Sequence, residues 1–201
     1  HYILIEPNSD EGVAFIQIDP EKKEITGYNP VHRIYQGYGK EAGFSGHFVV
    51  QLNEEIADYG VWDSTALTPG QKSTQGRKHG IGAWIKLASG KPGKTLVKVG
   101  TSFTSIDNAR KNLTAEIPGW DFNKVRQASS DTWNQALGQI AVKGNNEEEK
   151  VKFYSALYNA HFLPRTFSDA DGSYPKFDGG GQTMKMDHGT YYCDFSQWDT
   201  Y

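Results

Sequence analysis

The chain has 201 residues, 37% of them hydrophobic, so it can form one large domain or two small ones with a packed core. Its formal net charge of −3 gives no electrostatic reason to expect binding to nucleic acid or to an anionic membrane. No apolar run approaches ~18 residues, so no membrane span is expected. The single cysteine, Cys193, excludes an internal disulfide, and its aromatic neighbours favour a buried side chain. An export signal, if the protein has one, is expected upstream of His1.

The first half of the chain, to about residue 103, has the pattern of antiparallel β-structure. Residues 13–18 and 25–28 flank a polar turn, which is typical of a hairpin. The polar, basic segment 68–80 is expected to be a loop or a hairpin tip. Glycine and proline punctuate the strands at the spacing of an antiparallel sandwich. Further strands are predicted at residues 47–52, 82–87 and 95–99.

Helical patterns follow from residue 102 onward. Ser105 can cap a first helix, which ends at Pro118-Gly119, and Asp121 can cap a second. Residues 147–149 are all glutamate and favour the start of a third helix. The expected inner face of this third helix comprises Val151, Tyr154, Leu157, Tyr158 and His161, which makes His161 a core histidine rather than a ligand. Strands followed by helices argue against a parallel βαβ sheet and predict an α+β multidomain fold.

Trp198 and Asp199 form the strongest candidate for a binding site. An indole offers a sugar ring an apolar face, and an adjacent carboxylate can accept hydrogen bonds from neighbouring hydroxyls. The alternative is a core tryptophan next to an aspartate that caps a helix. The pattern of these two residues alone leaves both interpretations open.

The segment 168–174 is rich in oxygen ligands and could suggest calcium. It lacks the third acidic ligand and the closing glutamate of a helix-loop-helix calcium site, so a turn with solvated acids is favoured. Asn112 begins an N-glycosylation pattern, but it falls inside a predicted helix, and a structural role is favoured.

Several of these segments, taken in order, resemble glycoside hydrolase family 92, the calcium-dependent exo-acting α-mannosidases. Each match is short, but the order and spacing are specific, and the likeness is stronger in the second half of the chain. The matching segments are residues 99–103, 109–113, 116–122, 153–158, 164–169, 171–172 and 195–201.

The resemblance implies a β-sandwich followed by a helical linker and the first helices of an (α/α)6 barrel. The corresponding boundaries are 1–103 for part of an N-terminal sandwich domain, 104–143 for the linker and 144–201 for the beginning of the catalytic barrel. The remainder of the barrel is then a required partner.

The activity that the resemblance implies is calcium-assisted removal of terminal α-linked mannose with inversion, with α-1,2 as the expected linkage. Trp198 and Asp199 are expected to contact the terminal mannose of a glycan, and Arg165 and Asp169 are possible secondary contacts. The catalytic acid and base and most calcium ligands are expected outside this chain, so the chain alone is expected to be inactive. A secreted, periplasmic or cell-surface location follows from the same resemblance.

Two other functions compete with this one. The first is a β-sandwich carbohydrate-binding module with a helical spacer, in which Trp62 or Trp84 lines a groove and Trp198 is buried. Against it, Trp84 lies in a strand pattern beside Ile85 and Leu87, which favours a core position. The second is another (α/α)6 sugar hydrolase or phosphorylase, which fold analogy alone does not separate from the first hypothesis.

Overall fold

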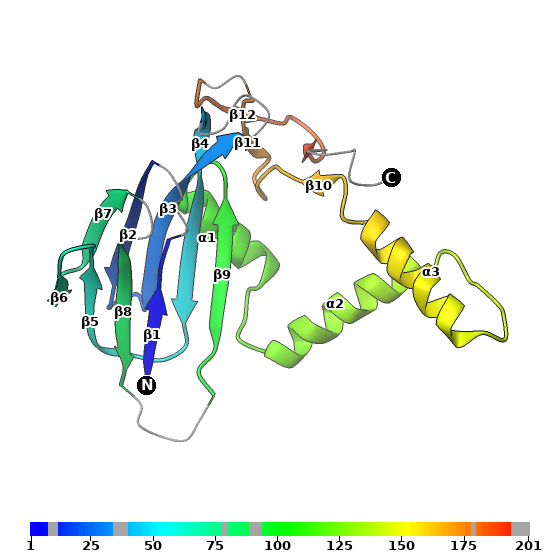
Figure 1. Ribbon diagram of the computed structural model, residues 1–201, viewed down its shortest axis with the longest axis horizontal. Coiled ribbons are helices and arrows are strands. Elements are labelled where there is room, and N and C mark those ends of the chain that lie inside the picture. Colours follow the sequence, from blue (N-terminus) through cyan, green and yellow to red (C-terminus); the bar gives the residue numbers. More distant parts are fainter. Residues whose placement is uncertain (8–11, 34–39, 78–79, 89–93, 178–179, 194–201) are drawn as a thin grey trace. The chain divides into compact units, whose positions relative to one another are not determined.

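The computed structural model describes residues 1–7, 12–33, 40–77, 80–88, 94–177 and 180–193 (Figure 1). The chain forms two compact units. The sandwich unit comprises His1–Trp120 and Ser168–Gly189, and the helical unit comprises Asp121–Phe167 and Thr190–Tyr201. The chain therefore leaves the sandwich unit, forms helices and returns to it.

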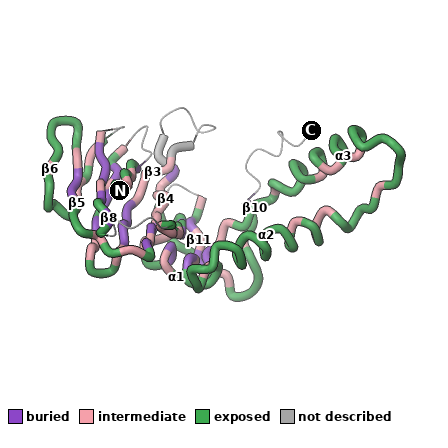
Figure 2. The backbone as a smooth tube through the Cα atoms, turned by 90° about the horizontal axis from the view of Figure 1, so that it is seen from below, coloured by how far each residue is buried: buried purple, intermediate pink, exposed green. Residues whose placement is uncertain are grey.

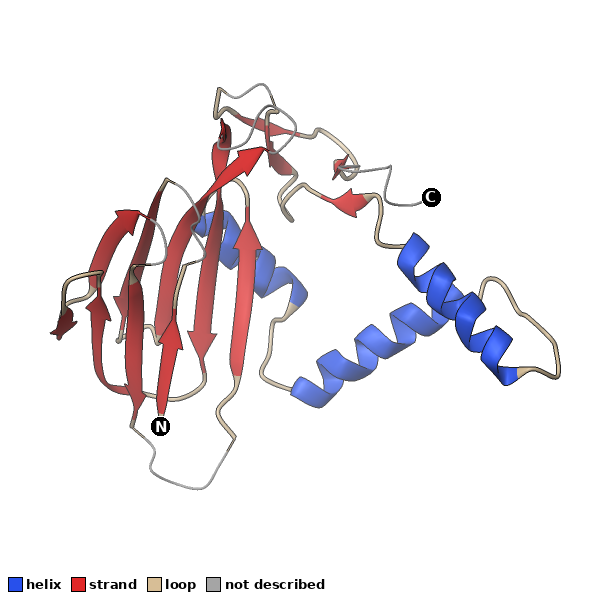
Figure 3. Ribbon diagram, in the orientation of Figure 1, coloured by secondary structure: helices blue, strands red, loops and turns tan. Residues whose placement is uncertain are grey.

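Two antiparallel sheets form the body of the sandwich unit (Figure 3). The five-stranded sheet has the order β7-β2-β3-β4-β9, and the four-stranded sheet has the order β1-β8-β5-β6. The strands of the first are β2 (Val13–Asp19), β3 (Glu24–Arg33), β4 (Lys40–Leu52), β7 (Ser73–Arg77) and β9 (Val97–Ser102). Those of the second are β1 (Tyr2–Ile5), β5 (Ile56–Trp62), β6 (Leu67–Pro69) and β8 (Gly82–Leu87).

The core lies between the two sheets because alternate side chains of each strand point inward. Ile16 and Ile18 of β2 are buried, as is Ile85 of β8. The sandwich prediction is thus confirmed, as are the predicted hairpin and the strand over 82–87. The core cluster comprises Ala14, Ile16, Ile18, Ile25, Val50, Leu52, Val61, Ile81, Ala83, Ile85 and Leu87.

The expectation of a loop over 68–80 was wrong for β7, which pairs with β2 through Thr74 and Ile16, among others. The reason is its place at the edge of the sheet. An edge strand has one neighbour, and β7 buries no residue, so it shows no alternation of apolar side chains.

Helix α1 (Ile106–Glu116) packs on the outer face of the five-stranded sheet, over β9 and β4 (Figures 1 and 2). Ser105 caps it as predicted, since its side chain accepts a hydrogen bond from the Asn108 backbone N–H. Leu113 packs with Val49 of the sheet. Gly100 allows this close approach: a Cβ there would lie 2.3 Å from the Ala109 carbonyl oxygen.

An ion pair also ties α1 to the sheet. The Arg110 guanidinium donates to both carboxylate oxygens of Glu24, at 2.6 and 3.2 Å, and Gln51 donates to the same carboxylate at 3.0 Å. Burial raises the pKa of Glu24, which is 3% exposed, but the hydrogen bonds from Arg110 and Gln51 outweigh burial and leave its pKa lowered. The carboxylate is therefore charged and fully engaged.

The helical unit contains α2 (Phe122–Leu137) and α3 (Glu147–Ala160). Asp121 caps α2 as predicted, and Asn146 caps α3. Neither helix has a buried residue. An aromatic contact between Trp133 and Tyr158, with ring centroids 4.5 Å apart, joins the two helices.

The interpretation of His161 as a core histidine was wrong. It follows α3 as an exposed C-cap residue, and its Nδ1 lies 2.8 Å from the Leu157 carbonyl oxygen. Its ring lies near that of Trp133, at 6.3 Å between centroids, but this face of α3 is not enclosed. None of the described helices is both long and apolar enough to cross a membrane.

Candidate functional site

Trp198 and Asp199, the expected sugar contacts, lie outside the described residues. The approach to them is described. Strand β13 (Tyr192–Cys193) pairs with β10 (Arg165–Thr166), and the Phe167 N–H donates to the Tyr191 carbonyl at 2.8 Å. Cys193 is buried, at 8% exposure, as its aromatic neighbours predicted.

Arg165, one of the two possible secondary contacts, is an exposed residue of β10, in register with Cys193. Among the described residues its guanidinium forms no ion pair of 4.0 Å or less. It belongs to the helical unit, whereas Asp169, the other possible contact, belongs to the sandwich unit.

Asp169 is the centre of a buried hydrogen-bond network. One carboxylate oxygen accepts hydrogen bonds from Ser102 Oγ at 2.8 Å, Thr104 Oγ1 at 2.5 Å and Asn108 Nδ2 at 3.1 Å. The other accepts from Asn112 Nδ2 at 2.7 Å. Asp169 is only 8% exposed, so these four donors replace the water that its charge would otherwise require.

The expectation of solvated acids in this loop was therefore wrong for Asp169. The turn itself is present, since the Ser173 N–H donates to Asp171 Oδ1 at 3.1 Å. The carboxylate is buried because four polar side chains at the end of β9 and along α1 face the returning chain. Asn112 has the structural role that was favoured: its amide also donates to the Thr101 carbonyl and accepts from the Ala170 N–H at 2.7 Å.

Asp171 provides a second attachment to α1. Its carboxylate lies 2.9 Å from Lys111 Nζ, and it also accepts from Ser173. The hydrogen bond from Lys111 is the main reason that the pKa of Asp171 is lowered to about 2. Burial opposes this shift, and the hydrogen bonds from Ser173 add to it. The loop is thus held by one buried acid and one partly exposed acid.

His47 lies close to the same network. It belongs to a row of directly paired residues on the outer face of the five-stranded sheet, Phe15, Tyr28, His47 and Ser102. Burial lowers the pKa of His47, against the opposing effect of the Asp169 charge. The imidazole is therefore neutral at pH 7, so the charge of Asp169 is stabilised by neutral donors rather than by an ion pair with His47.

The described residues do not fit a calcium site. They contain no cluster of three or more histidine, cysteine, aspartate or glutamate side chains placed to hold a metal ion. Both oxygens of Asp169 already accept hydrogen bonds from protein donors.

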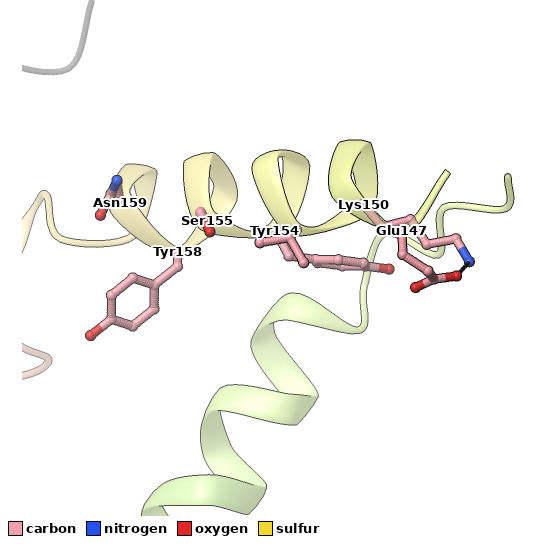
Figure 4. A pocket seen from close by; sticks show the side chains of 7 residues that line it. Glu147, Lys150, Tyr154, Ser155, Tyr158 and Asn159 are labelled. Carbon is pink, nitrogen blue, oxygen red and sulfur yellow. Dashed lines mark hydrogen bonds and ion pairs between the residues drawn. The ribbon is translucent and has the colours of Figure 1, made fainter. Parts of the chain in front are cut away.

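A concave surface of about 650 Å³ lies along α3 in the helical unit (Figure 4). Tyr154 is fixed there, because its hydroxyl donates to the Ile140 carbonyl at 3.0 Å and accepts from the Val142 N–H at 3.2 Å. A single helix provides all of the lining, so the surface is the uncovered side of α3 rather than a catalytic cleft. The lining residues are Glu147, Lys150, Val151, Tyr154, Ser155, Tyr158 and Asn159.

Comparison with known families accounts for both halves of the chain. Residues 2–102 match the N-terminal domain of glycosyl hydrolase family 92, and residues 108–201 match the catalytic domain of that family. The chain belongs to glycosyl hydrolase family 92. The family resemblance noted from the sequence segments is confirmed, and another (α/α)6 sugar enzyme family no longer needs to be considered.

Solved structures of family members share the fold. An inverting GH92 mannosidase from Bacteroides thetaiotaomicron is 24% identical and aligns with a TM-score of 0.83, over 99% of this chain and 26% of its own length. A GH92 α-mannosidase from the same organism is 23% identical with a TM-score of 0.77, over 99% of this chain and 28% of its own. A further structure of that enzyme contains mannoimidazole.

A curated relative from Arthroderma benhamiae is described as an uncharacterized secreted glycosidase. It is 34% identical over 95 residues, which are 45% of this chain and 12% of the relative. The chain thus spans about a quarter of the solved family members that it matches and a smaller share of this relative.

The two family matches meet between residues 102 and 108, so residues from both matches take part in the network around Asp169. Ser102 ends the N-terminal match, and Asn108, Asn112 and Asp169 belong to the catalytic match. Sequence reasoning missed Ser102, Thr104 and Asn108 as partners of Asp169. The available signal was the concentration of small polar side chains between the last strand of the sandwich and the first helix.

Proposed function

We propose that the complete protein is an exo-acting α-mannosidase that inverts configuration at the anomeric carbon and is assisted by calcium. The observation that carries this proposal is the match of both halves of the chain, in order, to the two domains of a glycosidase family whose similar solved members are named as mannosidases. The linkage proposed is α-1,2, and the 201 residues alone are proposed to be inactive.

Inversion needs two carboxyl groups on opposite sides of the sugar. One donates a proton to the glycosidic oxygen as the bond to the anomeric carbon breaks. The other removes a proton from the water whose oxygen forms the new bond. We propose that residues outside this chain provide both groups, within an (α/α)6 barrel that α3 begins.

The contribution proposed for this chain is sugar binding. Trp198 is proposed to stack on the terminal mannose, and Asp199 to accept hydrogen bonds from adjacent hydroxyls. The network around Asp169 supports a structural role for that residue, so Arg165 is the stronger of the two proposed secondary contacts. Calcium is proposed to bind the sugar hydroxyls through ligands elsewhere in the protein, and secretion is proposed from the description of the curated relative.

The test is mannose release by the complete protein from an α-1,2-linked mannobiose, with calcium and after chelation. Proton NMR of the fresh product distinguishes the anomers, and inversion predicts that β-mannose appears first. Release that is unaffected by chelation would exclude the role of calcium, and α-mannose as the first product would exclude inversion.

The site is tested with Asp199→Ala, which we expect to lower kcat/KM at least ~100-fold through the loss of hydrogen bonds to the sugar, with the melting temperature nearly unchanged. Glu116→Ala, at an exposed residue of the sandwich unit, is the control. A large fall in melting temperature with normal turnover would instead identify Asp199 as a helix cap.

A further inference from the structure

Two tryptophans of the four-stranded sheet are each paired with a glycine on the neighbouring strand. Trp62 of β5 is opposite Gly82 of β8, and Trp84 of β8 is opposite Gly60 of β5. The arrangement is reciprocal, so each strand contributes one indole and one glycine.

Each indole lies across its partner glycine. A Cβ on Gly82 would be 1.9 Å from Cζ2 of Trp62, and a Cβ on Gly60 would be 2.7 Å from Nε1 of Trp84. The glycines are therefore required to let the rings lie against the backbone. Nε1 of Trp84 is buried, and no residue in the described ranges accepts its hydrogen, so packing rather than a hydrogen bond holds this ring.

Both rings are on the outer face of the sheet. Ile85, next to Trp84, is buried in the core, and side chains alternate along a strand, so Trp84 points away from the core. The expectation that Trp84 is a core residue was therefore wrong, although the predicted strand was right. Alternation places Ile85 and Leu87 on the buried face and Trp84 on the opposite one, so being next to Ile85 does not indicate a core position.

The same face continues onto the first strand. Tyr2 is 60% exposed, and its ring centroid lies 6.1 Å from that of Trp84. Leu4 of β1 is 69% exposed and Leu67 of β6 is 63% exposed, and these two strands are the edge strands of the sheet. Helix α1 packs on the other sheet and does not cover this face (Figures 1 and 2).

Two side chains of opposite charge lie on this face. Asp58 and Lys86 are directly opposite each other in the register of β5 and β8, and both are exposed. One acid and one base give hydroxyl groups both an acceptor and a donor. A nucleic acid or an anionic membrane would need an excess of positive charge, which the pair of Asp58 and Lys86 does not supply.

We propose that this face, defined by Tyr2, Trp62 and Trp84, binds a polysaccharide chain of neutral pyranose sugars. The C–H faces of the sugar rings would stack on the aromatic rings, and Asp58 and Lys86 would bind hydroxyls at the edge. Trp62 and Trp84 are two residues apart along the strands and on neighbouring strands, which separates their Cα atoms by about 8 Å. Successive aromatic contacts of this kind suit an extended chain rather than a single sugar.

This binding proposal rests on the proposed mannosidase function in one respect, which is the choice of a mannose-containing polymer as the ligand to be tested. Its test is affinity electrophoresis of the complete protein in native gels that contain dissolved β-1,4-linked glucomannan. This polymer has no terminal α-mannose, so retardation does not report the proposed catalytic site. Mannose release from an α-mannobiose is measured separately, and its absence would contradict the mannosidase proposal without affecting this one.

The unaltered protein should be retarded in proportion to the glucomannan concentration. Tyr2→Ala should weaken the affinity at least ~3-fold, whereas Tyr2→Phe, which keeps the ring, should not. Trp84→Ala should weaken it at least ~10-fold, with thermal unfolding used to check the fold. Val13→Ala, at an exposed apolar residue of the five-stranded sheet, is the matched control and should migrate as the unaltered protein does.

Three results would overturn the proposal. One is the absence of retardation of the unaltered protein. Another is equal retardation of Tyr2→Ala, Trp84→Ala and the control. The third is a dimer in solution that Tyr2→Ala converts to a monomer, which would make this face a contact between copies of the chain.

Discussion

The sandwich unit and the helical unit differ in how they use apolar residues. In the sandwich unit, eleven buried side chains of the described residues form a continuous core between two sheets. In the helical unit, α2 and α3 bury none, and Val151 of α3 is 65% exposed. Both segments have the periodicity of folded structure, so the difference lies in what covers each apolar face. The sandwich carries its own partner sheet, whereas α2 and α3 do not bury each other's apolar side chains.

Core substitutions should show this contrast most strongly. Ile85→Ala, at a residue 1% exposed, should lower the free energy of unfolding by about 2–5 kcal/mol, because it leaves a cavity between the sheets. Val151→Ala in the 201-residue chain should change it by less than about 0.5 kcal/mol. Urea unfolding followed by tryptophan fluorescence measures both.

The same pair of variants in the complete protein sharpens the comparison. If further helices cover α3, Val151→Ala should there become destabilising by about 1 kcal/mol or more, while the effect of Ile85→Ala stays the same. An unchanged, negligible effect of Val151→Ala in the complete protein would mean that this face of α3 is exposed in the folded enzyme.

The attachment of the returning chain to α1 should show the next largest effect. Asp169→Ala should cost about 2–4 kcal/mol, because four donors lose their common acceptor inside the protein. Ser102→Ala removes a single donor and should cost about 1 kcal/mol. Urea unfolding of the two variants is the measurement, and equal costs would show that the four hydrogen bonds do not act on one shared carboxylate.

Local features of the sequence predicted much of the fold. Ser105 and Asp121 cap the helices that they were expected to cap, and alternation identified β2 and β8. These signals act over a few residues, so they can be read directly. The edge strand β7 buries nothing and gave no such signal.

The network around Asp169 could not be predicted for a different reason. Its partner Ser102 is 67 positions away along the chain, and the contact exists only because the chain returns to α1 after forming the helical unit. The loop sequence alone is compatible with a solvated turn, and only the donors opposite it explain why Asp169 is buried. The proposed sugar contacts, Trp198 and Asp199, were first identified by their side-chain chemistry, which left a helix-capping alternative open, and the family resemblance then favoured sugar binding.

The smallest effect concerns acid stability and separates the two acids of the loop. The pKa of Asp171 is about 2 in the folded protein, below its ordinary value, so ionised Asp171 favours the folded state. This contribution is complete above about pH 4 and is lost as the pH falls toward 2. Since Lys111 is largely exposed, solvent screening limits the effect to about 1 kcal/mol.

Asp171→Asn should therefore lower stability at pH 6 and leave it nearly unchanged at pH 2, as measured by urea unfolding at both pH values. Lys111→Met, which removes the main cause of the low pKa, should give most of the same difference. A constant effect of Asp171→Asn from pH 6 to pH 2 would show that the ion pair with Lys111 does not help to hold the returning chain on α1.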